Sequence, residues 1–216
     1  MGPTSYRTVA AAAEATVEDR RSVFTCWLRR AQDEDRARAV VEEARRTFRD
    51  ARHHCSAFVL GPAGATVRSN DDGEPAGTAG APMLEVLTGS GLTEVVAVVT
   101  RWFGGTLLGG GGLVRAYSGA VREAVAQARV LTRVQVEEVD VVVGHDLAGR
   151  LEHDLRTRGV PVPSVGYAEQ VRLRVQVPVD RADELPGLLA GLTGGAAVVD
   201  EDSRVRSWAD EGSATP

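Results

Sequence analysis

The spacing of hydrophobic and polar positions changes along this chain, and each change marks an expected helix or strand. Alternation over 22–28 and β-forming side chains over 54–60 and 65–69 predict three strands. Residues 33–51 gather apolar side chains on one face and charged ones on the other, which predicts an amphipathic helix. A continuous apolar run over 93–100 predicts a strand that is covered on both faces.

Glycine and proline mark the connections in this first part of the chain. Residues 70–80 are polar and rich in glycine, which predicts a loop. A short helix is expected over 82–87, with a proline early in it and Gly89 just beyond its end. A longer helix is expected over 113–128, directly after a dense run of glycines. This part of the chain therefore mixes strands and helices.

The pattern restarts after residue 134. Its order is strand, helix, strand, strand, helix, strand, which fits a ferredoxin-like βαββαβ unit. The six elements are expected over 139–143, 147–158, 160–164, 169–177, 181–192 and 196–199.

We therefore predict an α+β protein with two domains that meet near residue 135. The expected parts are an N-terminal extension over 1–18, a first domain over 19–134, a ferredoxin-like domain over 135–202 and a frayed, acidic tail over 203–216.

Charge is unevenly distributed along the chain, although the formal net charge is only −5. All 25 basic residues are arginine. Residues 1–136 hold 17 arginines and 15 acidic residues, a net charge of +2, whereas residues 137–216 hold 8 and 15, a net charge of −7. Because phosphate neutralisation needs cationic surface, any RNA contact is expected in the first part.

The composition indicates a cytoplasmic protein without a membrane partner. No apolar run approaches the ~20 residues that a membrane helix needs. The alanine run over 10–13 is broken by Glu14 and lacks a basic start, so it does not predict a signal peptide. Cys26 and Cys55 do not make a disulfide framework and are expected to be reduced.

The densest glycine segment lies within RWFGGTLLGGGGLVRAYSGA, where six glycines fall within nine residues ahead of a helix. Unpaired N–H groups at a helix N-terminus can bind an anion. The segment is not a P-loop, because the chain has no lysine, nor a dinucleotide fingerprint, because Arg115 stands where a third glycine belongs. Two alternatives remain: an anion-binding nest with Arg101 and Arg115 as charge partners, or a close crossing of backbone and helix.

Three carboxylates fall within four residues, at Asp71, Asp72 and Glu74. Such a group could hold Mg²⁺ through oxygen ligands or divide acid and base roles. Asp-Asp-Gly is also good turn chemistry, and no nucleophile of recognised context accompanies it. We therefore favour an ordering role over catalysis, and we assign no catalytic residue, metal ion or cofactor.

His53 and His54 begin an expected strand, where alternation sends the first, with Cys55, to one face and the second to the other. No further ligands have the spacing of a zinc site, and the Cys–His pair alone is weak evidence for a nucleophile. We therefore expect a histidine that lines a cleft, or one held in the core. The neighbouring pair Trp102 and Phe103 could stack on a nucleic-acid base or cap a core.

Three segments together resemble the YigZ/IMPACT family: ARHHCSAF, NDDGEPAGTAGAPMLEVL and VVTRWFGGTLLGGGGLVRAYSGAV. The bacterial YigZ branch fits best because an acidic βαββαβ unit follows, and the match covers about 21–178. The resemblance implies a first domain with a two-layer α/β fold, like that of a small-subunit ribosomal protein and the GHMP kinases. It also implies a ferredoxin-like second domain and, from the eukaryotic relatives, a link to translation and stress regulation.

The resemblance assigns the binding site position by position. The expected site residues are His53, His54, Asp71, Asp72, Glu74, Thr78, Arg101, Gly104, Gly105, Gly109, Gly110, Gly111, Gly112 and Arg115. All of them except Gly110, where relatives commonly carry a bulkier residue, are carried over from the family motifs. The chain departs from the family pattern at Ala81, where relatives often carry lysine, which weakens any mechanism that needs a cation there.

These features predict a cytosolic binding protein whose cleft takes an anionic group. The amides of residues 109–112 would donate to that group, Arg101 and Arg115 would neutralise it, and Asp72 and Glu74 would order the loop or hold a cation. The expected partners are RNA, the ribosome, translation factors or an anionic small molecule. One alternative is a metal-dependent hydrolase or phosphotransferase in the same cleft. Another is a protein-interaction module that uses the exposed sheet face of the second domain.

Overall fold

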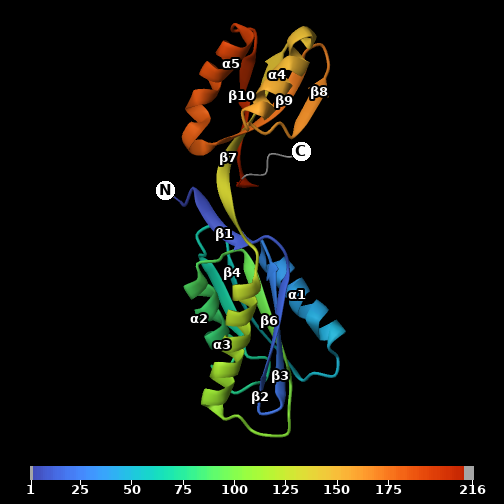
Figure 1. The fold of residues 1–216 in the computed structure, drawn as a ribbon, viewed down its shortest axis with the longest axis vertical. Coiled ribbons are helices and arrows are strands. Elements are labelled where there is room, and N and C mark those ends of the chain that lie inside the picture. The colour runs from blue at the N-terminus through green and yellow to red at the C-terminus, as the bar shows by residue number, and fades with distance from the viewer. Residues whose placement is uncertain (1, 212–216) are drawn as a thin grey trace. The chain divides into compact units, whose positions relative to one another are not determined.

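The computed structural model describes residues 2–211 and divides the chain into two compact units, Met1–Thr132 and Arg133–Pro216. Figure 1 shows that each unit combines helices with β-strands. The chain is therefore a mixed α and β protein, as its patterns predict.

The first unit is built on an antiparallel sheet with the strand order β2-β3-β6-β4-β5. The central strand buries every residue from Val95 to Arg101, so both of its faces need cover, as the apolar run predicts. The strands are β2 (Ala13–Asp19), β3 (Ser22–Arg30), β4 (His53–Leu60), β5 (Thr66–Asn70) and β6 (Val95–Trp102).

Helices cover both faces of this sheet (Figure 1). α1 (Glu34–Thr47) shares a core with Val96 and Val98 of β6. α2 (Gly80–Ser90) and α3 (Gly110–Gln127) share the other core with the alternate residues of the same strand. The sheet with α2 and α3 makes two layers, as expected, and α1 adds cover on the opposite face, because alternation along a fully apolar strand places a core on each side of the sheet.

Two strands lie where an N-terminal extension was expected. β1 (Ser5–Val9) buries Tyr6 and Val9, and the Tyr6 hydroxyl donates to the Glu94 carboxylate at 2.7 Å. β2 pairs with β3 along its whole length. These segments are therefore part of the fold, and their many polar residues reflect strands that expose one face.

The second unit follows the expected order of strands and helices. Its antiparallel strands have the order β10-β7-β9-β8, and both helices share one core with the buried face of this sheet. β7 begins in the last residues of the first unit. The elements are β7 (Val130–Val143), α4 (His145–Thr157), β8 (Ser164–Tyr167), β9 (Val171–Pro178), a 3-10 turn (Val179–Glu184), α5 (Leu185–Thr193) and β10 (Val198–Asp210).

The last strand extends further than the sequence pattern predicts. Residues 203–216 are expected to fray, but β10 continues to Asp210. Arg204 and Arg206 of this strand form ion pairs with Glu137 of β7. Charged residues that look like a solvated tail therefore have their partners on a neighbouring strand. The final part of the expected tail, 212–216, lies outside the described residues.

Candidate functional site

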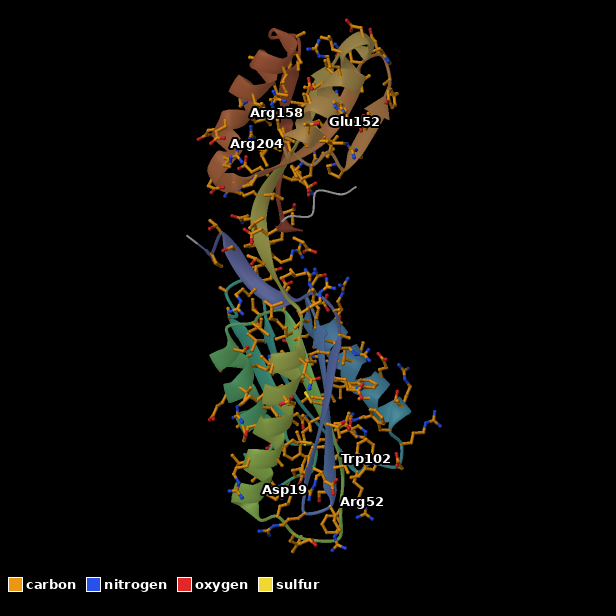
Figure 2. All side chains as sticks on the ribbon, in the orientation of Figure 1. Asp19, Arg52, Trp102, Glu152, Arg158 and Arg204 are labelled. Carbon is orange, nitrogen blue, oxygen red and sulfur yellow. The ribbon has the colours of Figure 1, made fainter. Side chains whose placement is uncertain are left out.

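The two predicted loops begin at the same end of the first sheet. Strand pairing sets His53 at the start of β4 opposite Arg101 near the end of β6. The 71–79 loop follows β5, and the 103–109 loop follows β6. Figure 2 labels Trp102, the last residue of β6, at this end of the unit. Segments that are distant in the sequence therefore meet at one edge.

A buried ion pair joins the acidic loop to the sheet. The Oε1 atom of Glu74 accepts hydrogen bonds from Nη1 of Arg101 at 2.6 Å and from the hydroxyl of Tyr117 at 2.7 Å. Glu74 is 8% exposed, Arg101 is 7% exposed, and Tyr117 of α3 is fully buried. The network therefore connects the acidic loop, β6 and α3, and its burial makes the loss of either charge costly.

Asp71 ties the acidic loop to the start of α2. Its Oδ1 accepts from the backbone N–H groups of Ala79 at 3.0 Å and Gly80 at 2.8 Å, and its Oδ2 accepts from that of Gly77 at 2.8 Å. Burial alone would raise the pKa of Asp71, but the three hydrogen bonds outweigh it and hold the pKa below its usual value. Asp71 therefore orders the loop as an anion.

We expect Asp71→Asn to lower the free energy of unfolding by about 0.5–2 kcal/mol at neutral pH, because an amide offers fewer acceptors to the three N–H groups. The folded pKa is lowered, so the stabilisation is present above the unfolded pKa and is lost as the pH falls through the folded pKa. The difference between the two proteins should therefore shrink in acid. Urea unfolding at neutral and acidic pH measures it.

Asp35→Asn is the matched control, since Asp35 is an exposed acidic residue in the first turn of α1. We expect this control to change the free energy of unfolding by less than about 0.5 kcal/mol. Equal losses in the two variants, or a loss in Asp71→Asn that persists in acid, would contradict the ordering role.

Asp72 orients the two histidines. Its Oδ2 accepts from the backbone N–H of His54 at 2.6 Å, and its Oδ1 accepts from Nη2 of Arg45 at 2.7 Å. Its carbonyl oxygen accepts from Nδ1 of His53 at 2.8 Å. The buried His54 ring donates from Nε2 to the Phe48 carbonyl at 3.2 Å, and burial is the main cause of its lowered pKa. Both imidazoles are therefore held by the fold.

The sheet separates these two histidines. His53 is the cross-strand neighbour of Arg101, which pairs with Glu74 on the side of α2 and α3. His54 lines a cavity of about 380 Å³ whose other residues come from α1, β4 and β5. The structure therefore does not gather both histidines in a single cleft, because successive residues of a strand face opposite sides.

The acidic and sulfur-containing side chains of this region serve contacts within the protein. Among residues 2–211, no group of three or more His, Cys, Asp or Glu is arranged to hold a metal ion. The Cys55 thiol donates to the Asp71 carbonyl at 3.0 Å, and burial raises its pKa to about 12. Burial also raises the pKa of Cys26 and of Tyr117. The Cys55 thiol therefore helps to order the acidic loop, and a buried neutral thiol is a poor nucleophile.

Gly104 of the 103–109 loop and Gly112 in the first turn of α3 are required by close packing. A Cβ atom on Gly104 would lie 2.1 Å from the carbonyl carbon of Arg21 in the β2–β3 turn. A Cβ atom on Gly112 would lie 2.9 Å from the Cβ of Leu108. Gly104 therefore packs against the β2–β3 turn and Gly112 against the Leu108 side chain, so these close contacts are not the expected crossing of backbone and helix.

The other glycines at the start of α3 are not closely packed, unlike Gly104 and Gly112. Gly109 precedes the helix with a φ of +71° and supplies no side-chain cap. The atom nearest to a Cβ on Gly110 would be the Thr78 methyl carbon at 3.8 Å, and the atom nearest to one on Gly111 would be Nη1 of Arg115 at 3.6 Å. The first turn is therefore accessible, between the acidic loop and an exposed arginine.

Thr78 and Gly105, two of the expected site residues, have structural roles within their loops. The Thr78 hydroxyl donates to the Pro75 carbonyl at 2.7 Å, within the acidic loop. Gly105 has a φ of +83° and open space around it, so it serves the turn of the second loop.

Arg20 and Arg21, which the sequence pattern does not indicate as site residues, contact the 103–109 loop at this end of the unit. Nη1 of Arg20 donates to the Leu107 carbonyl at 3.4 Å, and Nη2 of Arg21 donates to the Thr106 hydroxyl at 3.2 Å. The sequence feature that could have indicated them is this pair of adjacent arginines between the short segments 13–19 and 22–28. Its contact with a distant loop depends on strand pairing, which no local pattern shows.

These observations define a two-unit α/β protein whose first unit holds its motifs at one end of a sheet. A family model described as the Impact N-terminal domain matches residues 20–125, and one described as a domain of unknown function, DUF1949, matches 141–196. The chain therefore belongs to the IMPACT family, as its motifs predict.

Several relatives are similar over most of the chain. IMPACT family member YvyE of Bacillus subtilis is 35% identical over 197 residues, which cover 91% of each chain. IMPACT family member YigZ of Escherichia coli is 38% identical over 195 residues, which cover 89% of this chain and 95% of the relative. A crystal structure of a hypothetical protein aligns with a TM-score of 0.65 at 36% identity, over 91% of this chain and 97% of that one.

One relative is similar over a smaller part of its length. The Protein IMPACT homolog of Saccharomyces cerevisiae is 35% identical over 98 residues, which cover 43% of this chain and 37% of the relative. In the part of the chain that the structure describes, every helix is too short or too polar to cross a membrane.

Proposed function

We propose that this chain binds RNA through the loop end of its first unit, as a cytoplasmic protein of the translation or stress apparatus. The observation that carries the proposal is the start of α3, where an uncapped glycine turn lies beside the exposed Arg115. The N–H groups of a first helical turn and the helix dipole favour an anion. A backbone phosphate of RNA is such an anion.

Two further arginines extend the cationic surface around the 103–109 loop. Arg20 and Arg21 each donate to an uncharged oxygen of the loop, so these contacts leave their positive charge uncompensated. Arg20 and Arg21 contact the loop at Leu107 and Thr106, and the exposed Arg115 lies beside Gly111 in the helix that follows. Neutralisation of several phosphates by such cations is the main source of affinity for a nucleic-acid backbone.

The metal-dependent enzyme alternative has less support. It needs oxygen atoms of Asp72 and Glu74 for a cation, but each carboxylate accepts a hydrogen bond from an arginine. Glu74 is also buried. A metal ion in this place would have to displace the contacts that hold the acidic loop to the sheet.

We also assign the second unit to the ferredoxin-like class, and the strand order β10-β7-β9-β8 with both helices on one face supports this assignment. The likeness of the first unit to a small-subunit ribosomal protein and the GHMP kinases stays part of the proposal. The open sheet face of the second unit places Arg174 between Glu138 at 3.5 Å and Asp140 at 3.1 Å. These charges are already paired within the sheet. The protein-docking alternative therefore has less support than RNA binding at the start of α3.

We expect Arg115→Glu to weaken binding of a short fluorescein-labelled RNA by at least about tenfold at low salt, because it replaces a phosphate-neutralising cation with an anion. The magnitude of the slope of log affinity against log salt should fall by about one. Fluorescence anisotropy titrations at several salt concentrations measure both quantities.

Arg122→Glu is the matched control, since Arg122 is exposed on the same helix, about two turns beyond Arg115. At about 0.15 M salt, where charges more than about 8 Å apart are largely screened, this variant should bind RNA within about twofold of the wild type. Wild-type affinity in Arg115→Glu, or binding by the wild type that does not depend on salt, would contradict the proposal.

A further inference from the structure

Phe103 is an aromatic side chain held at the surface beside the arginines of the proposed site. It is 57% exposed, whereas the neighbouring Trp102 is partly buried and has contacts of its own. The Trp102 indole N–H donates to Oδ2 of Asp50 at 2.9 Å, and its ring packs edge-on against Phe48 with the centroids 5.2 Å apart. Of this pair, Phe103 is therefore the residue with a free ring face.

The position of Phe103 is fixed from below. The guanidinium carbon of Arg101 lies 5.7 Å from the Phe103 ring centroid, within the range of a cation–π contact. Arg101 itself is buried and anchored to Glu74 at 2.6 Å. The exposed ring therefore rests on a cation that the core holds in place.

The backbone after Phe103 is also anchored. The N–H of Gly104 donates to Oγ of Ser22 at 3.1 Å, and Gly104 packs directly on the backbone of Arg21. Binding through Phe103 would therefore not need to order this part of the chain. That preorganisation lowers the entropic cost of placing a planar group on the ring.

The surroundings of the ring indicate which planar group fits. Arg20 and Arg21 hold the same loop from the β2–β3 turn, and Arg115 lies at the start of the following helix. An aromatic platform among cations is the arrangement that takes bases by stacking and phosphates by charge. Duplex RNA offers its phosphates but keeps its base faces inside the stack.

We infer that this site selects single-stranded RNA, with an unpaired base stacked on Phe103 and the adjoining phosphates neutralised by Arg20, Arg21 and Arg115. The inference rests on the proposed function and names its ligand class. It assigns discrimination between single-stranded and duplex RNA to Phe103, and charge-based affinity to the arginines.

The test compares three probes: oligouridine, an RNA duplex of the same length, and inorganic polyphosphate as a probe of charge alone. Wild-type protein should bind oligouridine more tightly than the duplex. Phe103→Ala should weaken oligouridine binding about tenfold or more, which corresponds to the loss of one stacked base, and should leave polyphosphate binding unchanged. Phe103→Trp should restore oligouridine binding.

Leu107→Ala is the matched control, because Leu107 is 82% exposed in the same loop but offers no stacking face. It should bind oligouridine like the wild type. Equal affinity for oligouridine and duplex together with an unchanged Phe103→Ala would overturn the inference, while the loss in Arg115→Glu would still support the proposed function. Absence of binding to every RNA probe, including the case in which the loop binds anionic lipid vesicles instead, would overturn both.

Discussion

Replacement of Arg101 by methionine should lower the free energy of unfolding by about 3–5 kcal/mol, because it leaves the Glu74 carboxylate buried without its charge partner. Methionine keeps a long apolar side chain in the space, so the loss reports the charge and its hydrogen bond more than a cavity. Urea unfolding of the wild type and the variant at neutral pH measures the change.

Arg38→Met provides the matched control, since Arg38 pairs with Glu34 at 2.8 Å on the exposed face of α1. An exposed pair of this kind contributes about 0–1 kcal/mol. The double variant Arg101→Met with Glu74→Gln should lose less than the sum of the two single variants, because the two charges are coupled. A loss in Arg101→Met no larger than that of Arg38→Met would show that the buried pair does not hold the loop.

The second large effect is expected at Gly104. A methyl group there would lie 2.1 Å from the carbonyl carbon of Arg21 and 2.4 Å from the backbone nitrogen of Ser22. Neither atom can move without a shift of the β2–β3 turn. We therefore expect Gly104→Ala to lower the free energy of unfolding by about 1–3 kcal/mol, the usual cost of overpacking, as measured by urea unfolding.

Gly119→Ala separates this clash from the general effect of replacing glycine. Gly119 lies inside α3, and no atom lies within 4 Å of the position that its Cβ would take. Alanine there should raise the free energy of unfolding by about 0.5–1 kcal/mol, because glycine is unfavourable in a helix. If both variants were stabilised, the close approach at Gly104 would not exist in solution.

Arg101→Met and Gly104→Ala should also bind RNA more weakly than the wild type. Arg101 and Gly104 support Phe103 from below and behind. Their replacement should weaken oligouridine binding even where the protein remains folded, because the exposed ring loses its fixed position. Gly119→Ala should bind like the wild type.

The sequence pattern predicts many of the elements to within a few residues. The strand expected over 93–100 is Val95–Trp102, and the helix expected over 33–51 is Glu34–Thr47. The helix expected over 113–128 begins earlier, at Gly110. Glycine is a poor helix former, so the three residues 110–112 read as loop. In the structure they join the helix, and the Leu113 N–H donates to the Gly109 carbonyl at 3.0 Å.

The edge strands are the elements that the pattern misses. β1, β2 and the end of β10 have one exposed face or many charged residues. Their pairing partners lie elsewhere in the chain, such as Glu137 for Arg204. A prediction that uses only neighbouring residues therefore assigns these segments to an N-terminal extension and a C-terminal tail.

The sequence alone determined the family and the order of the elements in the second unit, because motifs and periodicity are properties of neighbouring residues. It also predicted which segments carry the site. Only the tertiary structure decided the role of each group. It paired Glu74 with Arg101, placed His54 on the opposite side of the sheet from that pair, and left Phe103 exposed while Trp102 packs on Phe48 and is partly buried. Those outcomes depend on strand register and on packing between distant segments, which set burial and charge partners.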